Sequence, residues 1–482
     1  MKKTLLLLSN HLNTRYLLPQ MDNTIVLTTD EQFRLFLYHQ TRIVLHRSAA
    51  KHFATNAGLM YFNGSTYRDV LQVIGESEIY VYDPYDMDHK ALIQEAFRGR
   101  PLEFLADLNF YHKDPTTLLT GPPYKLDPNY RVWRQDTGIL MDGSKPMGAK
   151  YSFDTENRKT APKEWKVPPP LTFEADEITK QVINEVQTKF DGHPSSSRLF
   201  GYPVTRDDAL AVLDQFISKR LPFFGDHQDA MLENEPWMAH SLLSASINLG
   251  LLFVDEVVQA VEHADAPLAA REGFIRQVLG WREYIRAIYV AQMPSYITHN
   301  YLDHHLPLPA LMYSAQTSMN CLSTVVQETI NHAYNHHIQR LMILGNITNL
   351  IGINPNLVRQ WFNEMYVDSF DWVVTPNVMG MASYADGGLM STKPYIASAN
   401  YINKMSNYCS SCRFDPTKKT GENACPVNVW YYDFLDRHQD RLATNPRMVY
   451  MYANYRKLSS DVLQEIKHKA DVYRKGVLDG TL

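Results

Sequence analysis

Cysteine is scarce in this chain, with only four residues among 482. Four cysteines at uneven spacing do not make the dense disulfide framework of a small secreted domain, and they suit metal ligation in a reducing compartment better. No stretch approaches the roughly 18 apolar residues that a transmembrane helix needs. The leucine run at residues 5–8 stops at Ser9 without a small-residue cleavage site, so it predicts a buried strand and not a signal peptide. We therefore expect a cytoplasmic protein without a membrane-spanning segment.

An excess of positive charge is also absent, because 47 Lys and Arg stand against 52 Asp and Glu and the net charge is −5. Net charge therefore does not indicate a nucleic-acid-binding protein, although it can hide a local basic face. Neither GxGxxG nor GxxxxGKS/T occurs in the N-terminal part, so the usual phosphate-binding loops are missing. The composition, with 45% hydrophobic and 21% charged residues, is typical of a globular protein, and the length suggests two or three domains.

The pattern of residues changes twice along the chain. The first part alternates β-rich runs (TLLLLS, TIVLTT, EIYVYDP) with segments suited to crossover helices, such as RIVLHRSAAKHFATNAG. This alternation predicts a parallel, Rossmann-like α/β domain over residues 1–130. Residues 131–198, rich in Pro, Lys, Ser and Gly, predict a long interdomain linker, and residues 199–482 predict a large all-α domain.

Capping signals mark two of the expected helices. Thr205 with Asp208 resembles a capping box ahead of ALAVLDQFI. Ser459 or Ser460 caps DVLQEIKHKADVYRK, a last helix that we expect to stop at Gly476.

The four cysteines form the most specific motif of the chain. Cys409 and Cys412 make a CxxC pair, Cys425 follows in a Cys-Pro dipeptide, and Cys321 stands alone on an earlier segment. Four thiolates suit either a structural zinc ion or a cubane iron–sulfur cluster, and the spacing alone leaves both open. Free buried cysteines are a third alternative.

A histidine interrupts an apolar pattern in VVQETINHAYNHHIQRLMILG, residues 325–345. Apolar residues recur there at steps of three or four and predict one helical face, on which His337 also falls. Burial on such a face lowers the pKa of a histidine unless an anion partners it. A hydrogen-bonded core histidine is the ordinary explanation, and a titratable catalytic group is the alternative.

Three other segments are ambiguous when taken singly. EGFIRQVLGWREYIRAIY (residues 272–289) is an amphipathic core helix, and YVDSFDWVVTPNVMGMASYADGG (residues 366–388) suggests a loop around a ligand. Residues 441–475 carry eight Lys or Arg against three Asp or Glu. That surplus fits either phosphate binding or a solvated helix face.

Together these segments resemble the photolyase/cryptochrome family, most closely its iron–sulfur bacterial branch of prokaryotic (6-4) photolyases and related cryptochromes. The resemblance covers nearly the whole chain and is strongest between residues 201 and 430, in VTRDDAL, FGDHQDAML, HSLLS, EGFIRQVLGWREY, HHIQRLMILGN, TPNVMGMA, TKPYIASANYINKMS and the cysteine loop. KYSFDTENR near the linker also resembles that branch. The N-terminal part resembles the family only loosely.

The resemblance implies an enzyme that repairs DNA with light. Reduced FAD would donate an electron to a pyrimidine–pyrimidone (6-4) lesion flipped out of UV-damaged double-stranded DNA, and the electron would return after rearrangement. It further implies a monomer with a 4Fe–4S cluster. A blue-light photoreceptor that signals through a protein partner is the alternative, and repair of cyclobutane dimers is a weaker one.

The resemblance also assigns roles to individual residues. It implies proton donation by His337 with His336 beside it and a hydroxyl from Tyr395, and a lesion cavity lined by Trp281 and Met381. It implies FAD binding by Phe224, the segment His240, Ser241, Leu242, Leu243 and Ser244, and by Arg340, Asp368 and Asn377. It implies inward electron transfer through Tyr313 and Trp361, and cluster ligation by Cys321, Cys409, Cys412 and Cys425.

The sequence departs from the family pattern at several places. Animal (6-4) photolyases carry a second histidine where this chain has Leu341, so the protonation network must differ. The residue opposite flavin N5, usually polar, falls on Val374, and Tyr313 stands where related proteins carry Trp. The branch's ribityllumazine antenna site carries a Glu and a small apolar residue, whereas this chain offers Gln32 and His46, which argues against an antenna.

Overall fold

A computed structural model of the chain describes residues 1–119, 121–196 and 198–482. Thr120 of the predicted α/β domain and Ser197 of the predicted linker lie outside the described residues. The N-terminal part contains one parallel sheet in the strand order β3-β2-β1-β4-β5. Its strands are β1 (Lys2–Leu7), β2 (Asn23–Thr29), β3 (Met60–Gly64), β4 (Ser77–Tyr82) and β5 (Leu102–Leu105). The parallel sheet predicted from the alternating pattern is therefore confirmed.

The central strand β1 is buried on both faces. Leu5 and Leu7 join the core that continues into the helical part of the chain, whereas Leu6 and Leu8 join a second core on the opposite face of the sheet. Successive side chains of a strand point to opposite faces, so an unbroken leucine run is what a doubly covered parallel strand requires. The run at residues 5–8 is thus a core strand, as expected.

Helices cross over between the strands on both sides of the sheet. They are α1 (Gln40–Ala57), α2 (Leu71–Ile74) and α3 (Met87–Ala96). The predicted crossover segment corresponds to α1, which ends at Gly58 in the left-handed conformation, with φ of 65°. The strand order reverses between β1 and β4, the place where open parallel sheets have a crevice at their carboxyl ends.

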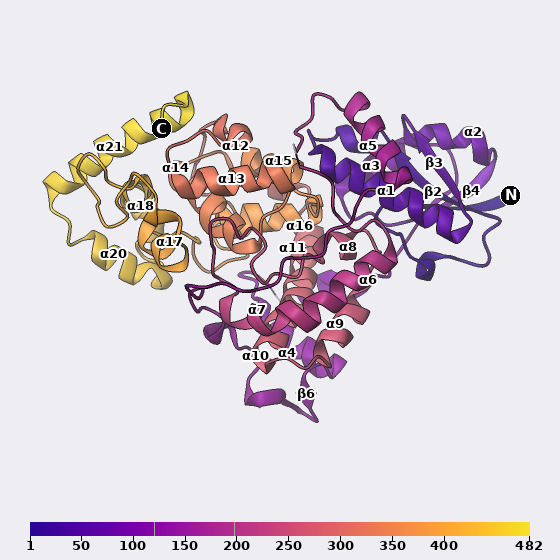
Figure 1. Ribbon diagram of the computed structural model, residues 1–482, viewed down its shortest axis with the longest axis horizontal. Helices are drawn as coiled ribbons and strands as arrows, with labels where there is room; N and C mark the ends of the chain where they lie inside the picture. The colour runs from indigo at the N-terminus through magenta and orange to yellow at the C-terminus, as the bar shows by residue number, and fades with distance from the viewer. Residues whose placement is uncertain (120, 197) are drawn as a thin grey trace.

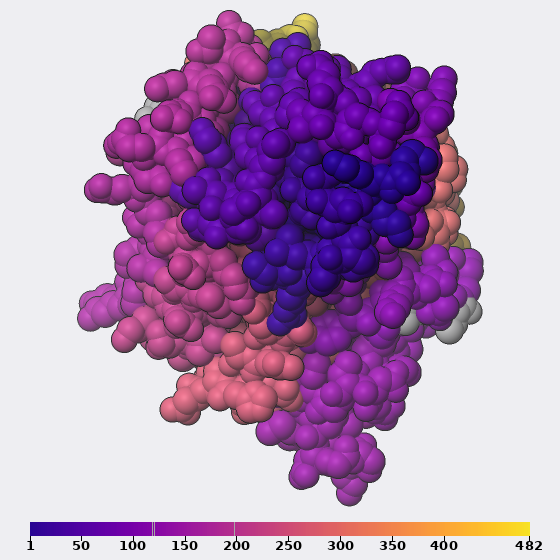
Figure 2. All heavy atoms as spheres, turned by 90° about the vertical axis from the view of Figure 1, so that its right-hand side faces the viewer, coloured from indigo at the N-terminus to yellow at the C-terminus, as the bar shows by residue number. Residues whose placement is uncertain are grey.

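The segment after the sheet runs along the outside of the molecule. It contains α4 (Leu126–Thr137), a short hairpin of β6 (Met141–Asp142) and β7 (Lys145–Pro146), and α5 (Glu177–Lys189). α5 packs on α1 at the border of the face that the α/β domain covers in Figure 2. The division of the chain at residues 130 and 198 stays a prediction.

The rest of the chain is helical, and Figure 1 shows its last helices at the opposite end of the molecule from the sheet. The first group is α6 (Arg206–Gln215), α7 (Leu221–His227), α8 (Ser244–Asn248), α9 (Val254–Glu262), α10 (Leu268–Ile275) and α11 (Arg282–Gln292). The central group is α12 (Leu311–Ser314), α13 (Asn320–His332), α14 (Asn346–Ile351), α15 (Pro355–Met365) and α16 (Asp371–Pro376). The last group is α17 (Ala399–Met405), α18 (Pro426–Arg437), α19 (Gln439–Leu442), α20 (Val449–Tyr455) and α21 (Ser460–Asp479).

Four π-helical segments interrupt this helical part. They are η7 (Phe216–Arg220), η8 (Arg276–Trp281), η10 (Gln339–Gly345) and η11 (Asn377–Ala382). π-Helical turns are rare and occur frequently at functional sites. Three of the four carry residues that the sequence nominated: Trp281 in η8, Arg340 in η10, and Asn377 and Met381 in η11.

Two of these segments pack unusually close to each other. A Cβ atom added at Gly345 of η10 would lie 2.8 Å from the Cβ of Ala382 in η11. Glycine is therefore required where η10 and η11 meet, and this contact fixes the position of the HHIQR segment relative to the loop at residues 366–388.

Two sequence predictions about helices need correction and one is confirmed. The expected continuous helix over residues 325–345 is wrong, because α13 ends at His332, Ala333 adopts a left-handed conformation, and helix resumes at His337. α21 does not stop at Gly476 but continues to Asp479, with Gly480 as its left-handed cap. Thr205 caps α6 as predicted, since its hydroxyl accepts a hydrogen bond from the Asp208 amide at 3.1 Å. No helix in the described ranges is long and apolar enough to span a bilayer.

Candidate functional site

Three histidines from two segments meet beside the break in the 325–345 region. The rings of His240 and His336 stack in parallel, with centroids 4.4 Å apart and planes at 11°. His336 is buried, and neither of its ring nitrogens has a hydrogen-bond partner among the described residues. Nε2 of His240 is likewise unpaired. Buried polar atoms are normally satisfied, so this wall presents donors and acceptors that a ligand could pair.

His337 differs from its neighbour because its side chain is exposed. Burial by the surrounding protein, followed by the charge of Arg340, nevertheless lowers the pKa of His337 to about 4. A ring that is both accessible and desolvated faces space enclosed by protein. The pKa of His336 lies well below its usual value, first through burial and then through His240, His337 and Arg340. Without a bound anion both rings are therefore neutral at pH 7.

The break at Ala333 explains why these two histidines face differently. On one continuous helix, His337 would continue the apolar stripe into the core. Because helix restarts at His337, this residue begins a new helix and its ring leaves the stripe. The sequence pattern therefore placed His337 on a helical face that the structure does not contain.

Arg340 and Asp368 form the charged part of the site. Nη2 of Arg340 lies 3.0 and 3.2 Å from the two carboxylate oxygens of Asp368. Asp368 also accepts a hydrogen bond from the Ser244 hydroxyl at 2.7 Å. The guanidinium carbon of Arg340 stands 3.9 Å from the centroid of the Tyr366 ring. Charge and stacking together hold this guanidinium in one orientation.

The other residues nominated for flavin binding are distributed around this pair. Phe224 is buried on α7, and its ring meets His240 edge to face at 5.5 Å. Ser241 and Leu242 form a turn in which Leu242 has a φ of 62° and the Ser241 hydroxyl accepts from the Leu243 amide. The Asn377 amide donates to the carbonyl of Val373 one turn earlier. Their roles stay predictions.

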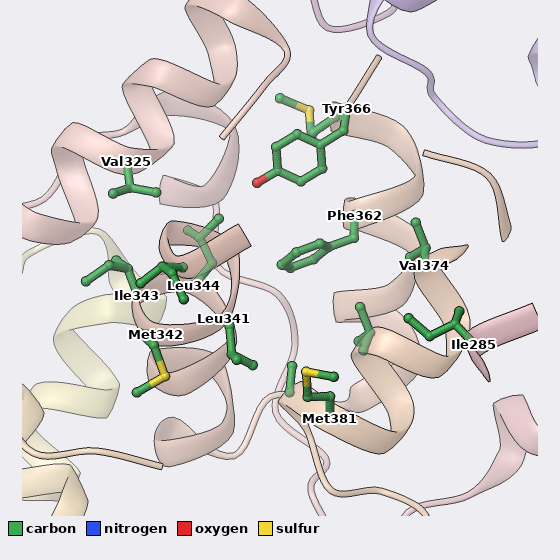
Figure 3. Close-up of a cluster of buried hydrophobic side chains, with 14 of the residues drawn as sticks. Ile285, Val325, Leu341, Met342, Ile343, Leu344, Phe362, Tyr366, Val374 and Met381 are labelled. Carbon is green, nitrogen blue, oxygen red and sulfur yellow. The ribbon is translucent and has the colours of Figure 1, made fainter. Parts of the chain in front are cut away.

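The residues nominated for the lesion are placed on three different elements. Trp281 is half-buried in η8, and its ring lies 5.8 Å from Tyr284. Met381 is buried in η11, and Figure 3 shows it across from Leu341. Tyr395 is half-buried on the loop before α17. Burial and the charge of Asp154 raise its pKa, while Arg158 lowers it, so the charges around it come partly from the linker region.

The four cysteines line one cavity. Cys321, Cys409, Cys412 and Cys425 line one pocket together with apolar residues such as Met319, Ile402 and Phe414. All four are free thiols, and burial raises the pKa of Cys425 to about 12 while the amides of Val427 and Asn428 lower it. Among the described residues, no set of three or more His, Cys, Asp or Glu side chains is arranged to hold a metal ion.

A hydrogen-bond chain connects the cysteine loop to the histidine segment. Nε2 of Gln339, three residues from His336, donates to the Tyr408 hydroxyl at 3.0 Å and to Glu328 at 2.6 Å. Tyr408 directly precedes Cys409, and Asn320, the neighbour of Cys321, donates to the carbonyl of Tyr408 at 2.9 Å. Hydrogen bonds therefore connect the cysteine loop to the histidine helix, although the two are about 70 residues apart in the chain.

Replacing Tyr408 by phenylalanine tests this coupling. Removing the hydroxyl leaves one hydrogen of the buried Gln339 amide without an acceptor, so we expect a loss of about 1–3 kcal/mol in the free energy of unfolding. Chemical denaturation measures this loss. Tyr450→Phe is the matched control, because Tyr450 is 86% exposed on α20. Equal stability of the two variants would contradict the proposed coupling.

Glu328 makes the stability of this region depend on pH. Burial, with a smaller contribution from Glu233, raises its pKa to about 8, against 4.5 in an unfolded chain. Between these values the folded protein holds a proton that the unfolded chain has lost, so stability falls as pH rises from about 4.5 to 8. The loss is on the order of a few kcal/mol. Glu328→Gln should weaken the dependence of the melting temperature on pH over this range. A pH profile unchanged from the wild type would contradict the raised pKa of Glu328.

Three residues at the site were not found from the sequence. Arg220 is fully buried, donates to the carbonyls of Trp237 and Met238, and faces His240 closely enough to lower its pKa. Tyr366 stacks on Arg340, and it stands at the start of the 366–388 segment, which could have indicated it. Glu364 accepts a hydrogen bond from Tyr313. Nothing local in the sequence distinguishes Arg220 or Glu364 from ordinary helix residues.

A family model and a curated relative give the same family. The model of the family described as deoxyribodipyrimidine photo-lyase-related protein matches residues 5–202. A (6-4) photolyase from Agrobacterium fabrum is 46% identical over 348 residues, which cover 71% of this chain and 69% of that protein.

Two solved structures share the fold across both full chains. A bacterial class III photolyase from Agrobacterium tumefaciens superposes with a TM-score of 0.54 at 15% identity, over 100% of this chain and 97% of that one. An archaeal photolyase from Sulfolobus tokodaii, solved with two FAD molecules, has a TM-score of 0.51 at 13% identity, over 98% and 100% of the two chains. The parallel sheet followed by a large helical part is the fold of these proteins. The chain belongs to the photolyase/cryptochrome family.

Proposed function

We propose that this protein is a (6-4) photolyase that repairs pyrimidine–pyrimidone photoproducts in DNA with light. The observation that carries the proposal is His337, an accessible imidazole in an otherwise buried wall beside the Arg340–Asp368 pair. A group that donates a proton to a lesion must be reachable by the lesion, and the exposed ring of His337 meets this condition. The identity to a (6-4) photolyase over most of both chains supports the same conclusion.

FAD fits the surroundings of these residues. Unpaired buried nitrogens of His240, His336 and Arg220 lie in the same wall as the turn at Ser241 and Leu242, and could pair with polar atoms of the cofactor. We propose that Phe224, residues 240–244, Arg340, Asp368 and Asn377 hold FAD. When bound and reduced, FAD supplies an electron to the lesion on absorbing light.

The protein residues supply position and a proton. Arg340, held by Asp368 and Tyr366, presents a fixed positive charge beside the histidines. Bound phosphate groups would raise the pKa of His337, so that its ring carries the proton that it donates to the lesion. His336 is stacked on His240 beside it. Tyr395, Trp281 and Met381 would contact the extruded bases. A lesion already badly stacked is the least costly to extrude.

A 4Fe–4S cluster fits the cysteine cavity. A zinc ion needs four sulfurs at about 2.3 Å from one point, whereas a cubane cluster holds its ligands further apart around a larger volume. The four thiols line one pocket with apolar walls, and a Cys-Pro dipeptide like the one at Cys425 ends the cluster-binding run of bacterial ferredoxins, which favours the cluster. We propose a structural role for it, because the cavity joins α13 to the C-terminal helices.

A lumazine antenna does not fit the stretch that would hold it. Gln32 and His46 are both buried. Nδ1 of His46 is paired with the Ser9 hydroxyl at 2.9 Å, and Gln32 accepts from the Tyr67 hydroxyl at 2.5 Å. The His46 ring also packs against Phe370 at 5.5 Å. Both side chains are buried and bonded within the protein, so we propose that this stretch binds no lumazine.

The test is illumination of the reduced protein with an oligonucleotide that bears one (6-4) lesion. Restoration of two normal thymines in the light, and none in the dark, is the expected result. Light-induced spectral change without repair would favour the alternative, a blue-light photoreceptor of the same fold. Repair of an oligonucleotide with a cyclobutane dimer, and not of one with a (6-4) lesion, would identify the cyclobutane dimer as the substrate.

A further inference from the structure

Tyr313 and Glu364 form a short hydrogen bond near the surface. The hydroxyl of Tyr313, on α12, lies 2.5 Å from Oε2 of Glu364 at the end of α15. Tyr313 is 43% exposed, whereas Glu364 is 8% exposed. Burial raises the pKa of Glu364, while the Tyr313 hydrogen bond lowers it. A buried carboxylate of raised pKa is a better proton acceptor than an exposed one.

This pair stands at the outer end of an aromatic path. Nε1 of Trp361 donates to the carbonyl of Met312, the residue before Tyr313, at 3.0 Å. The Trp361 ring lies 5.3 Å from Phe362 and 5.8 Å from Tyr366. Tyr366 in turn stacks on Arg340.

Figure 3 shows the residues at the inner end of the path. Phe362 and Tyr366 project from α15 and its end toward η10, where Leu341 and Leu344 lie. The path therefore runs from Tyr313, through the Met312 carbonyl bonded to Trp361, to the rings of Phe362 and Tyr366 and on to the Arg340–Asp368 pair, beside which the proposed function places FAD.

Tyrosine at the outer end changes the chemistry that the path requires. A tryptophan can lose an electron and remain a cation radical for a time. A phenol that loses an electron becomes a very strong acid, so its oxidation is favourable only if a base takes the proton at once. In this chain the carboxylate of Glu364 already accepts a hydrogen bond from the phenol of Tyr313.

We propose that Glu364 is the proton acceptor that allows Tyr313 to serve as the terminal electron donor for photoreduction of the flavin, an inference that rests on the proposed function. The oxidant is the light-excited oxidised flavin. One electron leaves Tyr313 and passes inward through Trp361 to the flavin. The O–H bond of Tyr313 breaks and an O–H bond forms on Oε2 of Glu364, which leaves a neutral tyrosyl radical and a neutral carboxylic acid. An external thiol then returns the electron, and Glu364 returns the proton.

Transient absorption and electron paramagnetic resonance of the flavin-loaded protein test this inference. In the wild type a laser flash should produce a neutral tyrosyl radical, and its formation should be slower in D₂O. Glu364→Gln keeps a hydrogen-bond acceptor but not a base, and should lose most of the tyrosyl signal. Tyr313→Phe should lose it entirely. Glu76→Gln, an exposed carboxylate on the sheet domain, should match the wild type.

The Tyr313→Trp variant is the decisive background in which to test Glu364→Gln, because a tryptophan that loses an electron needs no base to take a proton at once. Adding Glu364→Gln to Tyr313→Trp should leave the radical yield unchanged, whereas a mere structural role of Glu364 would lower it there too. A tyrosyl signal that survives Glu364→Gln overturns the inference. Repair by chemically reduced protein does not use this path, so its loss in the wild type overturns the proposed function and, with it, this inference.

Discussion

Replacing His337 by alanine is expected to lower the rate of (6-4) repair by roughly 10²–10⁴-fold, the usual contribution of a positioned general acid. The side chain is exposed and makes no hydrogen bond on which the fold depends, so flavin content and affinity for damaged DNA should stay near wild type. Repair per absorbed photon is measured on an oligonucleotide with one lesion, with flavin absorbance and DNA titration alongside. Full activity of the variant would remove His337 from the mechanism.

Two further variants separate proton donation from packing. His337→Asn keeps a polar side chain of similar reach that cannot act as an acid near neutral pH, and should be as defective as the alanine variant. His305→Ala is the matched control, since His305 is exposed and pairs only with Asp303 in the described structure. Activity restored by asparagine would indicate that hydrogen bonding, without proton transfer, is sufficient.

Replacing Cys425 by alanine is expected to remove the metal and destabilise the C-terminal helices. Cys425 is the residue before α18 and lines the same pocket as Cys321 of α13, so a cluster bound there would join the two helices. Metal binding at a structural site contributes to folding directly, on the order of several kcal/mol. Iron should fall from about four atoms per chain to a small fraction, and the melting temperature should fall with it.

Ser410→Ala in the same loop is the control for this variant, because Ser410 is exposed and bonds only the carbonyl of Asn407 in the described structure. One zinc ion per wild-type chain, with no iron, would end the cluster assignment. Iron retained at the wild-type level in Cys425→Ala would exclude Cys425 as a ligand. The Gln339–Tyr408 bond makes a second readout possible, since loss of the cluster should also alter the environment of His336.

Much of the fold could be predicted from local pattern. The leucine run at residues 5–8 can only be a strand covered on both faces, and the segment that became α1 has the length and composition of a crossover helix. Thr205 caps its helix by accepting a hydrogen bond from the amide three residues later, a contact that needs no tertiary information. The end of α21 was misplaced because Gly476 is tolerated inside a helix that packs on α18, and Gly480 provides the cap.

The sequence by itself determined the class of the fold and nominated the residues of the site and four candidate sulfur ligands, because strand alternation, helix caps and cysteine spacing are local properties. Tertiary structure alone decided how the site is assembled. The left-handed turn at Ala333 directs His337 away from the core, and the π-helical segment η10 places Arg340 beside Asp368. The same packing bonds Tyr313 to Glu364, 51 residues away. These features depend on contacts between distant segments, such as Gly345 against Ala382, which no periodicity within one helix can encode.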